Sequence, residues 1–166
     1  MGGAGDGVGV TYYAAQREVG DRFEAYLTER LALSGHTVTR HGSKAAQLAH
    51  GDLCVDGDHV EIKYDDRLAA TENLYIEVAE KHDPRQATWV PSGIWAGSDA
   101  AWYVIGNAQR VYVFRREDLR WFSTLAREIE IKRGTSRGYL LPTSEGCRLV
   151  ACDRRWAVDL MNSEAP

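Results

Sequence analysis

Residues 52–64 read Asp52-Leu53-Cys54-Val55-Asp56-Gly57-Asp58-His59-Val60-Glu61-Ile62-Lys63-Tyr64, and this stretch decides the fold. Two largely apolar runs flank Asp56-Gly57, a pair suited to a tight turn with positive φ, so the stretch predicts a β-hairpin. Because side chains alternate along a strand, Glu61 and Lys63 share one face of the second run. The first run then brings Asp52 alongside them.

Two carboxylates beside one ammonium group form a site for a hard divalent cation, with a proton-handling group in reach. The pattern Asp-x8-Glu-x-Lys also arises by chance in a chain with 24 acidic and 20 basic residues. In that case Glu61 and Lys63 are simply the solvent face of an amphipathic hairpin. From this stretch alone, both interpretations stay open.

Length and composition indicate one ordinary globular domain, with 166 residues, 44% hydrophobic and 27% charged. Residues 1–10 lack the basic and apolar regions of a signal peptide, so we expect a flexible tail followed by a domain over residues 11–166. No apolar run approaches the roughly 18 residues that span a bilayer. We therefore expect a cytoplasmic protein without membrane partners, with reduced thiols at Cys54, Cys147 and Cys152.

The net charge of −4 argues against a protein that coats nucleic acid through bulk electrostatics. Residues 110–137 have the opposite charge balance, because this segment contains eight basic residues and only four acidic ones. This segment is either the basic flank of an enzyme that acts on a polyanion, or a solvated helix face with mixed charges.

Apolar periodicity predicts a helix over residues 11–33, which Ser34-Gly35 would end. A short strand over residues 36–41 and a polar loop over 42–51 lead into the hairpin. The later pattern predicts a strand at 73–79, a long loop at 80–100, paired strands at 101–105 and 110–114, a helix at 116–132, and short strands or loops at 139–141 and 148–152.

With Glu24 on the first helix, Asp52 at the start of one strand and Glu61-Ile62-Lys63 on the next, residues 12–125 resemble the PD-(D/E)xK nuclease superfamily, including its phage and bacterial members. The resemblance implies an α/β fold with a single-domain, restriction-endonuclease-like αβββαβ core, a central mixed sheet flanked by helices. One departure is Gly51, where a proline often precedes the aspartate.

The resemblance also implies a metal-dependent DNA nuclease that hydrolyses phosphodiester bonds through a Mg²⁺-activated water, with Mn²⁺ as a substitute. Asp52, Glu61 and the Ile62 carbonyl would hold the ion. Lys63 would orient or help deprotonate the water and would offset the charge that develops on the phosphorane, and Glu24 would hold a metal-bound water or a second ion. DNA would be the partner, a homodimer is expected, and a bacterial or phage-infected cell would be the setting.

Further residues carry two interpretations each. Glu77 either extends the acidic cluster or forms a salt bridge with an arginine. His82, Arg85 and Gln86 either contact DNA phosphates or belong to an ordinary surface loop. Trp89 and Trp95 either stack on unpaired bases or anchor the long loop.

Two other functions compete with the nuclease: a non-catalytic nucleic-acid-binding or phage or defence assembly module on the same fold, and a hydrolase of small phosphate esters. The five histidines form no His-x3-His pair. His50 is either a nitrogen ligand beside Asp52 or, as we expect, an exposed residue of its loop. No Gly-x-Ser-x-Gly elbow is present.

Overall fold

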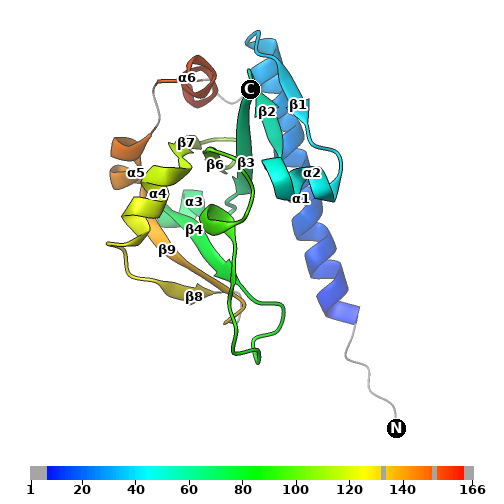
Figure 1. The fold of residues 1–166 in the computed structure, drawn as a ribbon, viewed down its shortest axis with the longest axis vertical. Coiled ribbons are helices and arrows are strands. Elements are labelled where there is room, and N and C mark those ends of the chain that lie inside the picture. Colours follow the sequence, from blue (N-terminus) through cyan, green and yellow to red (C-terminus); the bar gives the residue numbers. More distant parts are fainter. Residues whose placement is uncertain (1–6, 132–133, 151–152, 163–166) are drawn as a thin grey trace.

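The computed structural model describes residues 7–131, 134–150 and 153–162 (Figure 1). In chain order its elements are α1 Gly7–Leu33, β1 Val38–Arg40, α2 Lys44–His50, β2 Leu53–Val55, β3 Asp58–Tyr64, α3 Leu68–Thr71, β4 Asn73–Glu80, β5 Val90–Pro91, the 3₁₀ turn η1 Gly93–Trp95, β6 Trp102–Gly106, β7 Val111–Arg115, α4 Arg116–Ser123, β8 Ile129–Ile131, β9 Ser136–Pro142, α5 Thr143–Leu149 and α6 Arg155–Asn162.

A five-stranded mixed sheet lies at the centre, in the order β1-β2-β3-β6-β7. Its neighbours are antiparallel except β3 and β6, which run parallel. The predicted hairpin is confirmed: Leu53 pairs with Val60, and the turn residues Asp56 and Gly57 have φ of 51° and 92°. The chain is therefore a mixed α/β protein, as the sequence indicated.

A second, antiparallel sheet has the order β5-β4-β9-β8. The predicted strand at residues 73–79 forms, but as β4 it belongs to this sheet and not to the central one. Asp65 directs the chain there, because its buried carboxylate accepts hydrogen bonds from the backbone N–H groups of Arg67 (3.0 Å) and Tyr75 (3.2 Å). The reversal after β3 thus ends one sheet and begins the other.

Helices cover one face of the central sheet, and the second sheet covers the other (Figure 1). On the helix side, α1 and α6 bury a cluster that includes Leu27, Ile62 and Trp156. On the other side, alternate residues of β4 such as Ile76 pack with Tyr103 of β6. The central sheet, which was expected to be flanked by helices, therefore has α1 and α6 on one face and the second sheet, together with α4, on the other.

Helix α1 begins at Gly7, so the last four residues of the expected tail are helical, and residues 1–6 lie outside the described part. Its predicted end is confirmed. Gly35 has φ of 86°, and the N–H of His36 donates to the Leu31 carbonyl. Among the described residues, no helix is both long and apolar enough to cross a membrane.

The helix predicted over residues 116–132 was too long, since α4 ends at Ser123. At its end, the hydroxyls of Ser123 and Thr124 donate hydrogen bonds to backbone carbonyls three residues earlier. Residues 129–131 pair with β9 as β8. Helix α6 was not predicted, although its Trp156 is part of the core.

Two glycine-to-alanine substitutions test this packing. A Cβ at Gly138 of β9 would lie 2.3 Å from the Ile76 carbonyl oxygen, whereas one at Gly20 of α1 meets nothing within 4 Å. We expect Gly138→Ala to lower the free energy of unfolding by about 2 kcal/mol or more. Gly20→Ala should raise it by about 0.5–1 kcal/mol. Urea unfolding measures both, and equal effects would contradict the pairing of β4 with β9.

Candidate active site

Asp52 directly precedes β2, whose last pair with β3 at this end is Leu53 with Val60. The Asp52 N–H donates to the Val60 carbonyl (2.8 Å), and the Asp52 carboxylate accepts from the Ile62 N–H (2.7 Å). Leu53, Val60 and Ile62 belong to the core on the helix side. By alternation, Asp52 and Glu61 share the opposite face, as the sequence predicted. The N–H and C=O of a strand residue point to the same edge, so the Ile62 carbonyl also faces Asp52.

Gly51 determines how the chain enters this site. Its φ is 79°, and its N–H donates to the Gln47 carbonyl, which ends α2. A Cβ there would lie 2.7 Å from the Val60 carbonyl oxygen. Proline has no N–H and a fixed φ near −65°, so it cannot occupy this position. The departure from the proline of the resembled family is therefore required by the C-terminus of α2.

The carboxylate of Asp52 is held in an unfavourable environment for its charge. Burial raises its pKa to about 6, and the neighbouring Glu61 carboxylate adds to the rise. The Ile62 N–H and the Lys63 ammonium oppose the rise, and the Glu24 carboxylate contributes a smaller increase. Near neutral pH, the ionised Asp52 carboxylate therefore lies beside the Glu61 carboxylate. The resulting repulsion is offset only in part by the Ile62 N–H and the Lys63 ammonium.

Lys63 lies on the same face of β3 as Glu61, and its Nζ is 2.7 Å from Glu61 Oε1. Burial alone would lower the pKa of Lys63, but the Glu61 carboxylate, with Tyr103 and Asp52, raises it above the ordinary value. Lys63 is thus a protonated group at neutral pH. Its side chain keeps 40% of its surface exposed, whereas Glu61 keeps 12%.

Glu24 reaches the same region from α1. Its carboxylate is 3.0 Å from the Arg40 guanidinium of β1, and its charge acts on Asp52. The structure thus brings Glu24, Asp52, Glu61 and Lys63 together from three segments: α1, the residue before β2, and β3. The ion pair with Arg40 holds the Glu24 side chain beside the hairpin.

Glu77 projects from β4 on the facing sheet. Its two carboxylate oxygens accept hydrogen bonds of 2.6 Å from the hydroxyls of Ser92 and Ser136. Tyr103 lies between the two acidic regions. Burial is the main cause of the raised pKa of its hydroxyl, and the negative charges of Glu61 and Glu77 raise this pKa further. Among the described residues, that hydroxyl is the buried side-chain polar atom without a hydrogen-bond partner.

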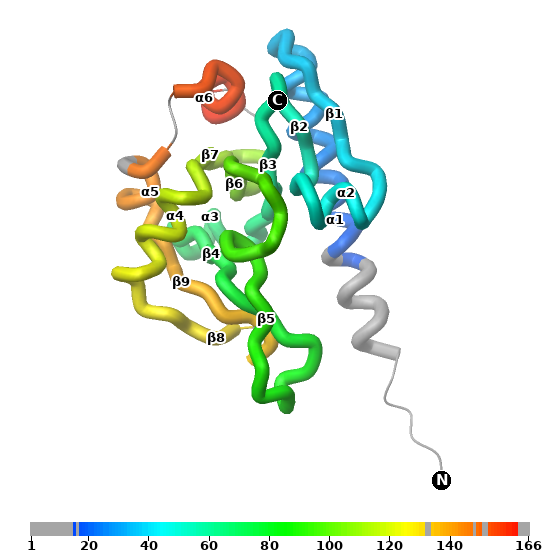
Figure 2. Tube along the Cα trace, viewed as in Figure 1, coloured from blue at the N-terminus to red at the C-terminus, as the bar shows by residue number. Residues whose placement is uncertain are grey.

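The residues proposed for DNA contact lie in the loop between β4 and β5, which projects from the end of the second sheet (Figures 1 and 2). Arg85 pairs with Asp83 at 2.8 Å, and the Gln86 side chain accepts from the Asp83 N–H. These contacts, which include no residue of the hairpin, stay within the loop. His82 acts on Asp83 electrostatically.

The tryptophans of the long loop meet cations. Arg137 and Lys81 lie 4.2 and 4.4 Å from the centre of the Trp89 ring, and Arg120 lies 5.0 Å from that of Trp95. These contacts stabilise the loop conformation. They favour the anchoring interpretation, because cations already cover these rings.

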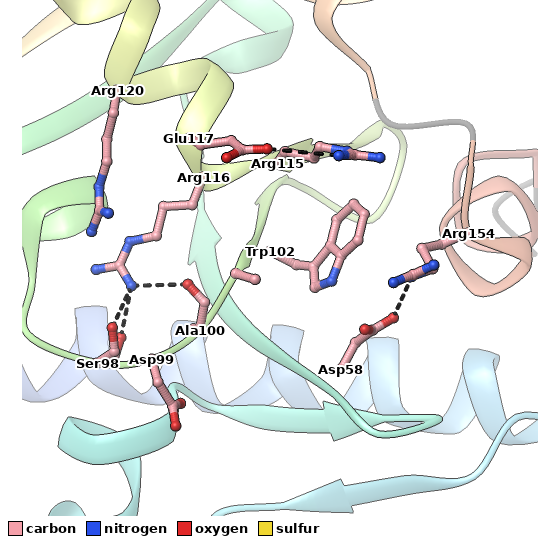
Figure 3. Close-up of a pocket in the computed structure, with 11 residues that line it drawn as sticks. Asp58, Ser98, Asp99, Ala100, Trp102, Arg115, Arg116, Glu117, Arg120 and Arg154 are labelled. Atoms are coloured by element: carbon pink, nitrogen blue, oxygen red, sulfur yellow. Dashed lines mark hydrogen bonds and ion pairs between the residues drawn. The ribbon is translucent and has the colours of Figure 1, made fainter.

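A cavity of about 460 Å³ opens beside the start of β6 (Figure 3), and neither Asp52 nor Glu61 lines it. Its arginines are engaged: Arg154 pairs with Asp58 at 2.9 Å, and Arg115 pairs with Glu117 and Asp153. Arg116 is buried. Its guanidinium donates to five backbone carbonyls of residues 93–100, those of Gly93, Ile94, Ala96, Ser98 and Ala100. These hydrogen bonds fix the loop conformation and use the guanidinium donors that would otherwise bind an anion.

The basic segment at residues 110–137 is likewise largely paired. Arg110 lies 2.8 Å from Glu72, and Arg137 lies 2.9 Å from Glu130. Lys132 and Arg133 lie outside the described residues. The described part therefore favours a solvated face with mixed charges. Cys54 and Cys147 are free thiols, and Cys152 is outside the described part.

The sequence missed one cluster beside the carboxylates. His50, predicted to be exposed in a loop, ends α2 and contacts Asp99, as does His59. His50 precedes Asp52 by two residues and His59 precedes Glu61 by two. Because β2 and β3 run antiparallel, this spacing does not place the two histidines opposite each other, and the cluster could not be found from it.

The carboxylate pair fits a divalent cation. Two neighbouring carboxylates and a backbone carbonyl are the hard oxygen ligands that Mg²⁺ and Mn²⁺ prefer. A cation between Asp52 and Glu61 would also relieve the repulsion that raises the pKa of Asp52. These residues can therefore bind an ion at the cost of ionising Asp52, and affinity should fall below about pH 6.

Asp52→Asn should stabilise the metal-free protein. Because the Asp52 pKa is raised from 3.8 to about 6, ionisation costs native-state stability, and this cost develops as the pH rises from about 4 through 6. We expect the variant to gain about 1–3 kcal/mol at pH 8, or roughly 3–10 °C in Tm, and almost nothing at pH 3.5. Thermal unfolding in EDTA measures this, with the exposed Asp66→Asn as control. A gain that does not depend on pH would contradict the account.

Comparison with known proteins gives no relative from which to transfer a role. The chain matches no protein-family model, no curated protein and no solved structure.

Proposed function

We propose that this protein is a Mg²⁺-dependent DNA nuclease of the PD-(D/E)xK type. The observation that carries the proposal is that hydrogen bonds to Val60 and Ile62 hold Asp52 beside Glu61, with Lys63 paired to Glu61 on the same face of β3. In a hairpin without a function at this position, two partly buried carboxylates side by side would only lower the stability of the fold. The raised pKa of Asp52 is the cost of that arrangement.

The topology supports a restriction-endonuclease-like core. Helix α1 is followed by the antiparallel strands β1, β2 and β3, and a crossover leads to β6, which runs parallel to β3. This order corresponds to αβββαβ, with one difference. The crossover carries the four-residue α3, strand β4 and η1 in place of a long helix.

Asp52, Glu61 and the Ile62 carbonyl would hold the ion, and Glu24 would add negative charge or hold a metal-bound water. Mg²⁺, when bound, would supply Lewis-acid chemistry that polarises a phosphodiester and makes a water more acidic. In the net hydrolysis, a bond forms between phosphorus and the water oxygen, the bond to the leaving oxygen breaks, and a proton of the water ends on that leaving oxygen.

Lys63 acts chiefly through its charge. Its raised pKa keeps the ammonium protonated at neutral pH, so it is poorly suited to accept a proton from water while it pairs with Glu61. A protonated ammonium beside the ion instead offsets the negative charge that develops on the phosphoryl oxygens. Of the two roles expected for Lys63, the structure favours charge stabilisation.

DNA cleavage tests the proposal through two substitutions. Asp52→Asn should reduce Mg²⁺-dependent cleavage by about 100-fold or more, because it weakens the ion site. Lys63→Met should reduce cleavage by about 100–1,000-fold while Mn²⁺ still binds, because the ion site stays intact and only charge stabilisation is lost. Cleavage of labelled linear, circular, branched and single-stranded DNA, with Mn²⁺ calorimetry, measures both.

Asp66→Asn is the control, since Asp66 is exposed and lies after the hairpin. Mn²⁺ binding that depends on Asp52 but is accompanied by no cleavage of any DNA would favour the non-catalytic assembly module. Turnover of a small phosphate ester without DNA cleavage would favour the third class. Full activity of Lys63→Met would refute the proposed site.

A further inference from the structure

Three histidine rings converge from separate segments. His41 follows β1, His50 ends α2 and His59 lies in β3. The ring centres of His50 and His59 are 4.7 Å apart. The ring centre of His41 lies 5.7 Å from that of His50 and 5.6 Å from that of His59. Two imidazoles on one tetrahedral ion, with metal–nitrogen bonds of about 2.0–2.1 Å, have ring centres about 5 Å apart. The spacing is therefore that of rings around a shared ion.

A carboxylate completes the cluster. Asp99 lies 2.9 Å from His50 Nδ1 through one oxygen and 2.7 Å from His59 Nδ1 through the other. Candidate ligand atoms of His50, His59 and Asp99 all lie within 4.8 Å of one another. The side chains are partly exposed, at 44%, 31% and 55%, so an ion can reach them from solvent.

The cluster is fixed in place by contacts that do not depend on a metal. The Asp99 N–H donates to the Ala49 carbonyl (2.8 Å), and Arg116 holds the carbonyls on either side of Asp99. Figure 3 shows the Asp99 carboxylate directed away from Arg116. His41 Nδ1 donates to the Gly51 carbonyl (2.9 Å), which leaves the Nε2 lone pair available. Metal-binding histidines are commonly oriented by such a bond.

We infer that His50, His59 and Asp99 form a binding site for a Zn²⁺-like divalent ion. Two imidazoles with one carboxylate select borderline metals such as Zn²⁺, Co²⁺ and Ni²⁺ over Mg²⁺. This ligand set differs from the all-oxygen set of Asp52 and Glu61. One hairpin thus carries two sites of different metal preference.

The second ion does not belong to a two-metal catalytic pair. His59 precedes Glu61 by two residues on the same face, which separates their Cα atoms by about 6.6 Å. Ions in two-metal sites lie about 3.5–4 Å apart and share ligands. The Zn²⁺-like ion would instead tie α2, β3 and the loop before β6 together. Because His50 is two residues before Asp52, it would also hold Asp52 in its position beside Glu61.

Calorimetric titration of the full chain with ZnCl₂, after removal of metal with EDTA, tests the inference. Wild-type protein should bind one Zn²⁺ per chain, and 5 mM MgCl₂, about the level used in nuclease assays, should not displace it. His50→Gln and His59→Gln should each weaken Zn²⁺ binding by about 100-fold or more. The loop substitution His82→Gln is the matched control and should leave it unchanged.

The double variant Asp52→Asn/Glu61→Gln separates this inference from the proposed function. It should keep Zn²⁺ affinity within about threefold, whatever the DNA assay shows. Co²⁺-loaded wild-type protein should show the intense visible bands of a tetrahedral ion, which His59→Gln should lose even if it binds Co²⁺ elsewhere. Equal Zn²⁺ affinity in all histidine variants, or loss of affinity in the double carboxylate variant alone, would overturn the inference.

Discussion

The register between β2 and β3 is the constraint on which the rest of the site depends. Two hydrogen bonds set it at its open end: the Asp52 N–H to Val60, and the Ile62 N–H to the Asp52 carboxylate. A shift by one residue would turn Val60 and Ile62 out of the core and Glu61 and Lys63 into it. Burial of apolar side chains on the helix side therefore fixes where the charged groups lie on the other.

The charged face is maintained against its own repulsion by the structure around it. Asp52 and Glu61 are kept together by the hairpin, Glu24 by its ion pair with Arg40, and the loop that carries Asp99 by the buried guanidinium of Arg116. The fold holds these like charges together, and their repulsion lowers the stability of the fold. This is the trade-off between a preorganised charged site and stability that proteins commonly show. A bound cation would remove much of the conflict.

Sequence patterns correctly predicted those features of the fold that depend on residues close together in the chain. The hairpin, the end of α1 at Gly35 and the paired strands β6 and β7 followed from alternation and turn chemistry, and Asp52, Glu61 and Lys63 were brought together as expected. Sheet membership was not predictable, because β4 chooses its partner through Asp65 and through contacts with β9, far away in sequence. The histidine cluster was missed for the same reason, since only the folded chain brings Asp99 to His50 and His59.

The position of Mn²⁺ in crystals grown with the ion tests the central claim most directly, by anomalous diffraction at the manganese edge. The account predicts a peak about 2.0–2.4 Å from carboxylate oxygens of both Asp52 and Glu61, with the Ile62 carbonyl in the same coordination shell. The absence of Mn²⁺ between these two carboxylates at millimolar concentration and pH 8 would contradict it.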